Sequence, residues 1–403
     1  MTEFAACARA ALADKGISMR RAARALNYDV AYLSRVLNGK QQPSLKLASG
    51  LDQLTDAGGT LLACVSQEPN SADSVTVSPW PAKSASETDG DLEALELARR
   101  VQASDVGRET LDRLEHAFDH MAIRYQTTPP PELLQDVRKH SSYVIKLLDG
   151  RMTLSEHRRL LVIGGWLSLL AATLHVDLKE NRAASSRLKT AALLAQHADH
   201  DEIHAWTYET DAWRALTTGD YARAVELSQA AQSLAPSGGS AEVQATAQEG
   251  RARARLGQRR EVYAAIDRVQ RLADGLEMRA GPEHHYQYDP PKATAYRATT
   301  LAWVGDPAAE DSAREVITQL GLGGAAKVWP RRAVSAHLDL ALTLLSTDRL
   351  DEACDTAQRA ILSGRLLGAN HWRVLEIVRA VEARKLPEAQ ELREAYQGLS
   401  LGM

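Results

Sequence analysis

The 403-residue chain is poor in cysteine and contains no long apolar run. Cys7, Cys64 and Cys354 lie far apart, without the CxxC or Cys/His spacing of a metal site, and they fit a reducing compartment. No apolar run reaches the roughly 18 residues of a membrane-spanning helix, and the start MTEFAACARAALADKG carries charges where a signal peptide is apolar. We therefore expect a cytoplasmic protein with no membrane partner.

Several catalytic motifs are also missing. The sequence contains no nucleophile elbow, Walker loop, dinucleotide-binding fingerprint or HExxH motif. The alternation of valine and isoleucine that is typical of strands is nearly absent, whereas alanine, leucine, arginine and glutamate recur at helical spacing. These patterns predict an all-α protein that is not an enzyme and requires no cofactor.

Positive charge is scarce overall and concentrated near the N-terminus. The whole chain carries a formal charge of −4. Its first 66 residues hold eight lysines and arginines against five carboxylates, a charge of +3, which leaves −7 for the other residues. A chain of this composition does not coat nucleic acid along its whole length. Any contact with nucleic acid is therefore expected in the N-terminal part.

A change in composition divides the chain into three parts. Residues 66–91, SQEPNSADSVTVSPWPAKSASETDGD, are rich in proline, serine and acidic residues and lack helical periodicity. We interpret this stretch as a flexible linker. It separates a small N-terminal domain, residues 1–65, from a larger helical domain, residues 92–403.

The larger domain contains a repeated pattern of two helices joined by a short turn. The clearest unit is HAWTYETDAWRALTTGDYARAVELSQAAQSLAP, with its turn at Gly219 and a helix stop at Pro236. Similar turns, spaced 40, 38, 48 and 43 residues apart when Gly219 is included, occur at Lys179, Gly257, Gly305 and Asp348. One helical hairpin cannot bury its own apolar face, so stacked hairpins share a core. The unit resembles the tetratricopeptide repeat, in a lengthened form.

The N-terminal stretch ISMRRAARALNYDVAYLSRVLNG reads as two short helices. Ser18 can cap the first helix, which ends at Leu26, and Asp29 can cap a second that runs to about Leu37. Asn27 occupies the turn between them, and Asn38-Gly39 ends the second helix. The small and apolar residues that would meet in one seam are Ala22, Ala23, Leu26, Leu33 and Val36. The arrangement predicts a helix-turn-helix.

MRRAARALNYDVAYLSRVLNGKQQPS resembles the lambda-repressor-like helix-turn-helix of the xenobiotic-response-element (XRE) family of transcriptional regulators. The whole chain resembles the class, common in actinomycetes, that joins this domain to a tetratricopeptide-like solenoid. The resemblance implies that the second helix enters the major groove of an operator in double-stranded DNA. It assigns base contacts to Val30, Ala31, Ser34 and Arg35, and phosphate contacts to Arg20, Asn38 and Lys40.

Among these residues, Arg35 is the best candidate for direct readout, because a guanidinium fork can pair with guanine O6 and N7. Two departures from the family pattern stand out. Val30 and Ala31 occupy positions where relatives often carry hydrogen-bonding residues, so readout there would use thymine methyl groups or DNA shape. Arg21 replaces the carboxylate or amide that would complete a capping box.

The larger domain offers weaker candidate sites. The segment EHHYQYDPPK could form a ligand or partner surface from His285, Tyr286, Tyr288 and Asp289, or it could be a packed loop between repeats. Trp206 and Trp213 share a helical face and either line such a surface or mark an interface between repeats. His197, His200 and His204 would face one another only on an unbroken helix. Arg331 and Arg332 could present their guanidinium groups to an acidic ligand, but a solvated helix start is the default expectation.

Together these patterns predict a homodimeric regulator that binds an operator. Its solenoid would supply dimerisation and a surface for a peptide, small-molecule or protein effector. A peptide groove is the weakest of these alternatives, because Asn181 and Asn370 are the only asparagines after residue 91. The other hypothesis is a scaffold or antitoxin-like protein, in which the solenoid binds a protein partner and DNA binding is secondary.

Overall fold

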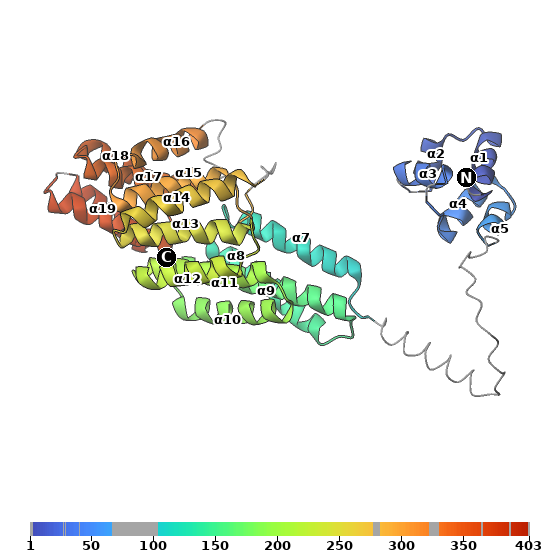
Figure 1. The fold of residues 1–403 in the computed structure, drawn as a ribbon, viewed down its shortest axis with the longest axis horizontal. Helices are drawn as coiled ribbons and strands as arrows, with labels where there is room; N and C mark the ends of the chain where they lie inside the picture. Colours follow the sequence, from blue (N-terminus) through green and yellow to red (C-terminus); the bar gives the residue numbers. More distant parts are fainter. Residues whose placement is uncertain are drawn as a thin grey trace. The chain divides into compact units, whose positions relative to one another are not determined.

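The computed structural model contains two compact units, Met1–Ser86 and Glu87–Met403, and all their described regular structure is helical. The described residues are 3–26, 28, 30–39, 41–66, 104–276, 283–321, 330–363, 366–386 and 388–401. Of the linker predicted at 66–91, only residue 66, the end of a helix, lies among them. The helices of both units are drawn in Figure 1.

The described part of the N-terminal unit, which ends at residue 66, contains five short helices: α1 (Glu3–Asp14), α2 (Met19–Ala25), α3 (Val30–Leu37), α4 (Leu45–Thr55) and α5 (Thr60–Ser66). They enclose one apolar cluster whose members from α2 and α3 include Ala22, Ala23, Leu33 and Val36, with Leu26 partly buried beside them. The predicted seam between the two helices is therefore confirmed. Because Ala22 and Ala23 are small and fully buried, the two helices can approach closely.

Polar caps fix the ends of α2 and α4. The Ser18 side chain accepts a hydrogen bond from the Arg21 amide, and Ser44 accepts one from the Leu47 amide. Gly39 follows α3 with φ of 69°, a conformation that glycine adopts without steric cost. The predicted start of α2 and end of α3 are confirmed. The turn residue Asn27 and the predicted cap Asp29 lie outside the described residues.

A buried carboxylate joins α4 to α5. The Asp52 side chain is 9% exposed, and its two oxygens accept hydrogen bonds from the amides of Gly59, at 2.6 Å, and Leu61, at 2.8 Å. Amides at a helix start have no partner inside the helix, so the carboxylate satisfies two such donors, one of which, the amide of buried Leu61, would otherwise have no partner. Asp52 thus holds the last helix against the core of the domain.

Replacing Asp52 by alanine is expected to destabilise the α4–α5 region by about 1–3 kcal/mol, because the buried amide of Leu61 loses its acceptor. Amide hydrogen exchange of residues 45–66 in the full chain measures this effect. Asp56→Asn is the matched control, since Asp56 is 91% exposed at its side chain and its 3.9 Å contact with Lys15 is a surface pair. Equal exchange rates in the two variants would contradict the role assigned to Asp52.

The C-terminal unit is a succession of packed helical hairpins. From residue 104, where its description begins, the helices are α7 (Arg108–Arg124), α8 (Pro130–Leu148), α9 (Leu154–Asp177), α10 (Asn181–His197), α11 (Asp201–Thr217), α12 (Tyr221–Leu234), α13 (Ser240–Arg255) and α14 (Arg259–Asp274). They are followed by α15 (Pro291–Val304), α16 (Ala309–Gly321), α17 (Pro330–Ser346), α18 (Leu350–Leu362), the short 3₁₀ helix η2 (Gly368–Asn370), α19 (His371–Ala383) and α20 (Ala389–Leu401).

The five turns predicted from the sequence all join the two helices of a hairpin. Lys179, Gly219, Gly257, Gly305 and Asp348 each have positive φ, between 61° and 86°. A left-handed residue at this point lets the chain reverse directly after a helix. The hairpin repeat is therefore confirmed, and its assignment to the tetratricopeptide type stays a prediction.

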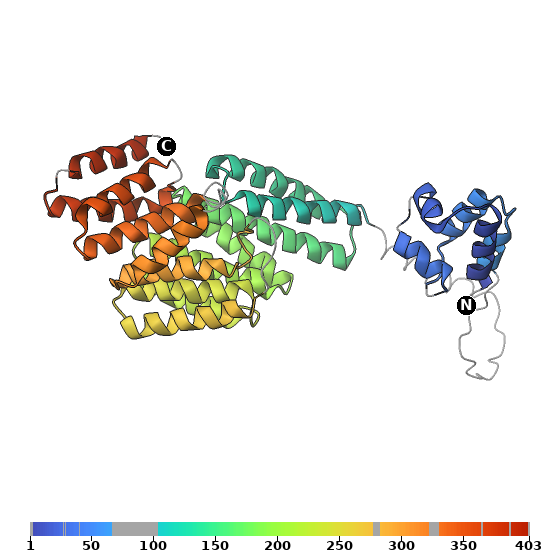
Figure 2. The ribbon, with the colours of Figure 1, turned by 90° about the horizontal axis from the view of Figure 1, so that it is seen from above.

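The first helices of successive hairpins form an inner layer. Consecutive members of the series α9, α11, α13, α15, α17 and α19 contact one another, and each also packs against the second helix of its own hairpin. Figure 2 shows the hairpins of this unit from a second direction. The series also returns to its beginning, because η2 contacts α9. At that contact a Cβ on Gly368 would lie 2.8 Å from the Asp177 carbonyl oxygen, so only glycine fits without a shift.

Helix α9 is the most apolar element of the unit. An 18-residue window within Leu154–Asp177 is apolar and long enough to cross a membrane, which the sequence pattern had not indicated. In the structure, 78% of that window is buried inside the protein. The helix packs against α7, α8, α10 and α11, which explains why it is apolar on all sides. It is the core helix of the hairpin unit.

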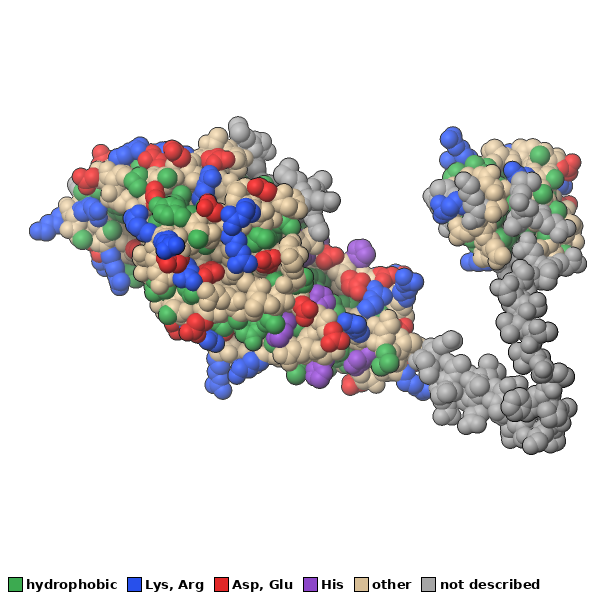
Figure 3. Space-filling model, viewed as in Figure 1, with side chains coloured by type: hydrophobic (Ala, Val, Ile, Leu, Met, Phe, Trp, Pro, Cys, Tyr) green, Lys and Arg blue, Asp and Glu red, His purple; other side chains and the backbone are tan. Residues whose placement is uncertain are grey.

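The outer surface of the hairpin unit carries mixed charges. On the face drawn in Figure 3, basic and acidic side chains alternate over the hairpins. One network joins α16 and α18, where Arg314 and Arg349 each contact both Glu310 and Glu352. Exposed pairs of this kind contribute little individually to stability.

Candidate DNA-contacting helix and interior cavity

Helix α3 has one face buried in the N-terminal core and one face exposed. Leu33, Val36 and Leu37 are buried, whereas Arg35 and Asn38 are exposed and Val30 is 38% exposed. The apolar side fixes the helix, and the opposite side is available to a partner. Eight residues give a helix of roughly 12 Å, about the width of the major groove of DNA.

The polar side chains of α3 are connected to one another and to the following loop. Arg35 Nε donates a hydrogen bond to Gln41 Oε1 at 3.1 Å, and Asn38 Nδ2 donates to Ser34 Oγ at 3.3 Å. Such contacts restrain these side chains near the surface that would meet DNA. Arg20 is exposed on α2. Lys40 lies outside the described residues, as does the environment of the Ala31 side chain.

The two tyrosines beside α3 belong to the core of the domain. Tyr28 and Tyr32 stack with ring centroids 5.6 Å apart, and both are half-buried against the apolar cluster of the domain. The two tyrosines pack against the core of the domain at the start of α3.

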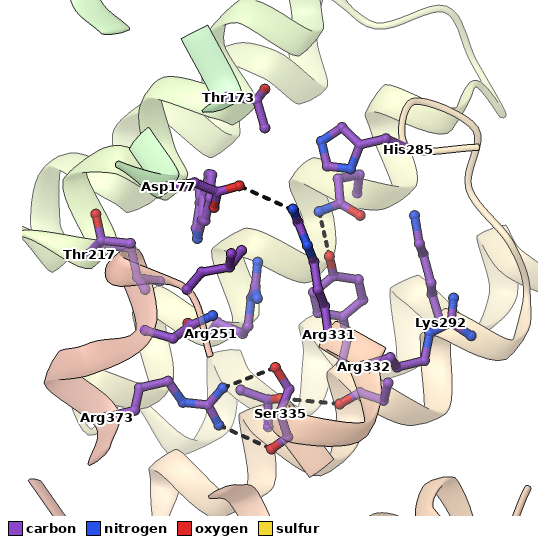
Figure 4. A pocket seen from close by; sticks show the side chains of 18 of the residues that line it. Thr173, Asp177, Thr217, Arg251, His285, Lys292, Arg331, Arg332, Ser335 and Arg373 are labelled. Atoms are coloured by element: carbon purple, nitrogen blue, oxygen red, sulfur yellow. Dashed lines mark hydrogen bonds and ion pairs between the residues drawn. The ribbon is translucent and has the colours of Figure 1, made fainter. Parts of the chain in front are cut away.

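The inner layer of the hairpin unit surrounds a cavity of about 190 Å³. Helices α9, α11, α13, α15, α17 and α19 all contribute to its lining, as does the loop at 283–290. Four of the seven tryptophans of the chain line it: Trp206, Trp213, Trp303 and Trp372. Figure 4 shows polar side chains from several inner helices that approach the same space. An aromatic lining with a few polar groups is typical of small-molecule sites.

Ion pairs cross the cavity between elements that are distant in sequence. Arg331 binds Asp177 at 3.1 Å, and Arg332 binds Glu283 at 2.6 Å. Both arginines were expected at a solvated helix start, and that expectation is wrong. Their side chains are only 14% and 9% exposed, because α17 begins inside the closed ring of inner helices. Each guanidinium loses contact with water on burial and binds a carboxylate of another element instead.

Burial changes the titration of the carboxylates around the cavity. It raises the pKa of Asp177 to about 6, although Arg331 and Tyr125 act in the opposite direction. Burial likewise raises the pKa of Glu209, despite a hydrogen bond from Gln244. At Glu283, burial opposes ionisation, but Lys292 at 2.7 Å and Arg332 outweigh it and hold the pKa below its usual range. The lining therefore contains carboxylates of different proton affinity.

The six residues proposed from the sequence as a ligand or partner surface divide into two groups. Trp206, Trp213 and His285 line the cavity. Tyr286 and Tyr288 are buried in apolar clusters, and Asp289 binds Arg332 at 3.3 Å. Because Tyr286 also bonds to Thr173 of α9, the segment acts as a packed loop that closes one side of the cavity.

Sequence reasoning did not identify the arginines and the lysine contributed by α13, α15 and α19. Arg251, Lys292 and Arg373 line the cavity beside the aromatic residues. Their positions in the sequence look like those of surface cations on amphipathic helices. The one available signal was the tryptophan and tyrosine of three first helices, α11, α15 and α19, which carry Trp206, Tyr208, Trp213, Tyr296, Trp303 and Trp372.

The three histidines at 197–204 do not share a helix. His197 is the last residue of α10, and His200 is the cap of α11, where its Nδ1 accepts a hydrogen bond from the Ile203 amide at 3.2 Å. Within the described residues, no group of three or more histidine, cysteine, aspartate or glutamate side chains has the geometry of a metal site.

Comparison with known proteins identifies the N-terminal unit. Residues 9–56 match the family model HTH_3, Helix-turn-helix. No curated protein and no solved structure matches the chain. The matched range begins within α1, includes all of α2 and α3, and ends directly after α4. Domains of this family bind DNA in transcriptional regulators and are typically not enzymes. The chain therefore carries an N-terminal helix-turn-helix domain of the XRE type, which indicates DNA binding and transcriptional regulation, followed by a large region of packed helical hairpins.

Proposed function

We propose that the chain is a cytoplasmic, homodimeric regulator that reads an operator through α3 and senses an effector through its hairpin unit. The observation that carries the first part is the exposed face of α3 in a domain that matches the helix-turn-helix family. Val30, Ala31, Ser34 and Arg35 are the proposed base contacts. Arg20, Asn38 and Lys40 are the proposed phosphate contacts.

Dimerisation is supported by the electrostatics of the N-terminal part. A charge of only +3 on the first 66 residues provides few phosphate contacts, so one domain alone would bind DNA weakly at physiological salt. Two domains on a two-fold operator would add their contacts, with half-sites about one helical turn apart. We assign dimerisation to the hairpin unit, as lengthened tetratricopeptide-type repeats.

The proposed sensing of an effector rests on the cavity of the hairpin unit. A space lined by tryptophans and charged side chains is suited to an effector that could alter the packing of the inner helices. Its volume of about 190 Å³ lies below the range typical of drug-sized ligands, which favours a small molecule over a peptide.

Arg35→Ala is expected to weaken operator binding by about 1–3 kcal/mol and to relax sequence preference at one base pair of each half-site. Genome-wide occupancy and footprinting of the full chain at moderate salt measure both effects, and two protected half-sites would report the dimer. Lys15→Ala is the matched control, because it also removes one positive charge but lies after α1 beside Asp56.

The control should reduce binding equally on all sequences or leave it unchanged. Operator occupancy by Arg35→Ala that equals wild type would contradict the proposed readout. If a protein partner still co-purified with that variant, the scaffold or antitoxin-like function would explain the chain better.

A further inference from the structure

Arg251 differs from the other cations that line the cavity. Lys292, Arg331, Arg332 and Arg373 each form an ion pair with a carboxylate. Arg251 forms none with the described carboxylates: its guanidinium contacts the Gln248 side chain and stacks on the Tyr296 ring, 4.4 Å from the centroid. Among the residues that the structure describes, its Nε has no hydrogen-bond acceptor. A guanidinium held flat on an aromatic ring keeps donors available for an oxyanion.

Further unpartnered donors come from neighbouring aromatic residues of the lining. The indole N–H groups of Trp303 and Trp372 are buried without an acceptor among the described residues, and Trp303 is 9% exposed. Both rings are fixed, because they contact each other with centroids 5.4 Å apart and hold Arg255 between them at 4.4 and 4.8 Å. Buried N–H groups normally donate a hydrogen bond to an acceptor. These two indole groups are therefore suited to an acceptor on a bound ligand.

The charges of the lining also favour an anion. Five cations line the cavity, against the carboxylates of Asp177, Glu209, Glu283 and Asp339. Three of these carboxylates are already bound to lysine or arginine at the cavity wall, and Glu209 is bound by Gln244. Burial raises the pKa of Asp177, Glu209 and Asp339, so the interior opposes the ionisation of these carboxyls. The guanidinium of Arg251 is the positive charge that remains without a direct counter-ion.

We propose that the cavity binds a small aromatic anion, with a carboxylate or phosphate group held by Arg251 and a ring packed among the tryptophans. The oxyanion would accept hydrogen bonds from the guanidinium, whose plane Tyr296 already fixes. The ring would pack against Trp303 and Trp372, whose unpartnered indole N–H groups would donate hydrogen bonds to the oxyanion. This inference deepens the sensory part of the proposed function and rests on it.

Isothermal titration of the full chain at pH 7.5 tests the proposal with four probes. Indole-3-acetate carries a ring and a carboxylate, and phenyl phosphate carries a ring and a phosphate. Indole-3-acetamide keeps the ring without the charge, and inorganic phosphate keeps the charge without the ring. We expect at least one aromatic anion to bind with a dissociation constant below about 10 mM, and the acetamide and inorganic phosphate to bind at least tenfold more weakly. The stronger of the two anions identifies the type of oxyanion.

Arg251→Gln is expected to weaken binding of the aromatic anion by roughly 10- to 100-fold, the value of a charge-assisted hydrogen bond. Arg251→Lys should retain part of the affinity, because the charge remains and the fork is lost. Arg260→Gln, at an exposed position on α14, is the matched control and should bind like wild type. Thermal unfolding by circular dichroism verifies that each variant is folded.

The proposal is wrong if neither aromatic anion binds below about 10 mM, if the acetamide binds as well as the acetate, or if folded Arg251→Gln and Arg251→Lys bind like wild type. Equal binding of inorganic phosphate and phenyl phosphate, with no binding of the acetate, would mean an adventitious ion only. Operator occupancy is measured separately. Anion binding without operator occupancy would refute the regulatory function alone, and operator occupancy without anion binding would refute this inference alone.

Discussion

Replacing Asp339 by alanine is expected to lower the free energy of unfolding of the hairpin unit by roughly 3–5 kcal/mol. Asp339 on α17 is 1% exposed, contacts the Arg373 guanidinium of α19 and accepts a hydrogen bond from Thr299 of α15 at 2.6 Å. Alanine would leave the guanidinium of Arg373, itself 6% exposed, without a carboxylate in the interior. Three inner helices would lose their common polar contact.

Urea unfolding of the full chain, followed by tryptophan fluorescence, measures this loss. The first 66 residues contain no tryptophan, so the signal does not report on the helix-turn-helix domain. Asp355→Ala is the control, because Asp355 forms an exposed pair with Arg359 on α18 and its loss should cost less than about 1 kcal/mol. The double variant Asp339→Leu, Arg373→Met should recover much of the stability, since it removes both charges. A double variant no more stable than Asp339→Ala would contradict this account.

The features that could be predicted from sequence are those set by neighbouring residues. Ser18 caps α2 through an amide three residues away, and Gly219 reverses the chain because it tolerates positive φ. The apolar spacing on α3 determines which side of that helix is buried, so the exposure of Arg35 follows from the pattern. These signals are local, and the structure agrees with them.

The cavity could not be predicted in the same way, because residues far apart in the chain form it. Arg331 and Asp177 are separated by 154 positions, and nothing near either residue indicates the other. Their contact depends on the inner helices closing a ring, which follows from the small rotation between successive hairpins. The same closure places Arg251 of α13 and Trp372 of α19 in the lining of one cavity. The periodicity of the sequence predicts the hairpins. It does not predict how the small rotations between successive hairpins add up along the chain.

The stability of the hairpin unit is expected to decrease as the pH rises from about 4 to 7, in part because of Asp177. Burial raises the pKa of this carboxyl from 3.8 to about 6 in the folded chain. A raised folded-state pKa means that folding favours the protonated form, so this stabilisation is complete below pH 4 and is lost as the pH rises through 6. The difference between the two pKa values corresponds to about 3 kcal/mol.

Asp177→Asn should remove this part of the pH dependence, because the amide has nearly the shape of the protonated acid and does not ionise. Relative to wild type, its free energy of unfolding should rise by up to about 3 kcal/mol between pH 4 and pH 7, measured by urea unfolding at each pH. The comparison cancels the contributions of Glu209 and Asp339, whose pKa values burial also raises.

A second variant tests the cause of the shift. Tyr125 and Arg331 are the ionisable groups that lower the pKa of Asp177, through a hydrogen bond and an ion pair. Arg331→Met removes the attraction that favours the carboxylate, so the pH window of the stability loss should move upward. If wild type and Asp177→Asn instead gave parallel stability curves from pH 4 to 7, Asp177 would be ionised throughout this range. The pair with Arg331 would then outweigh the cost of burying the carboxylate.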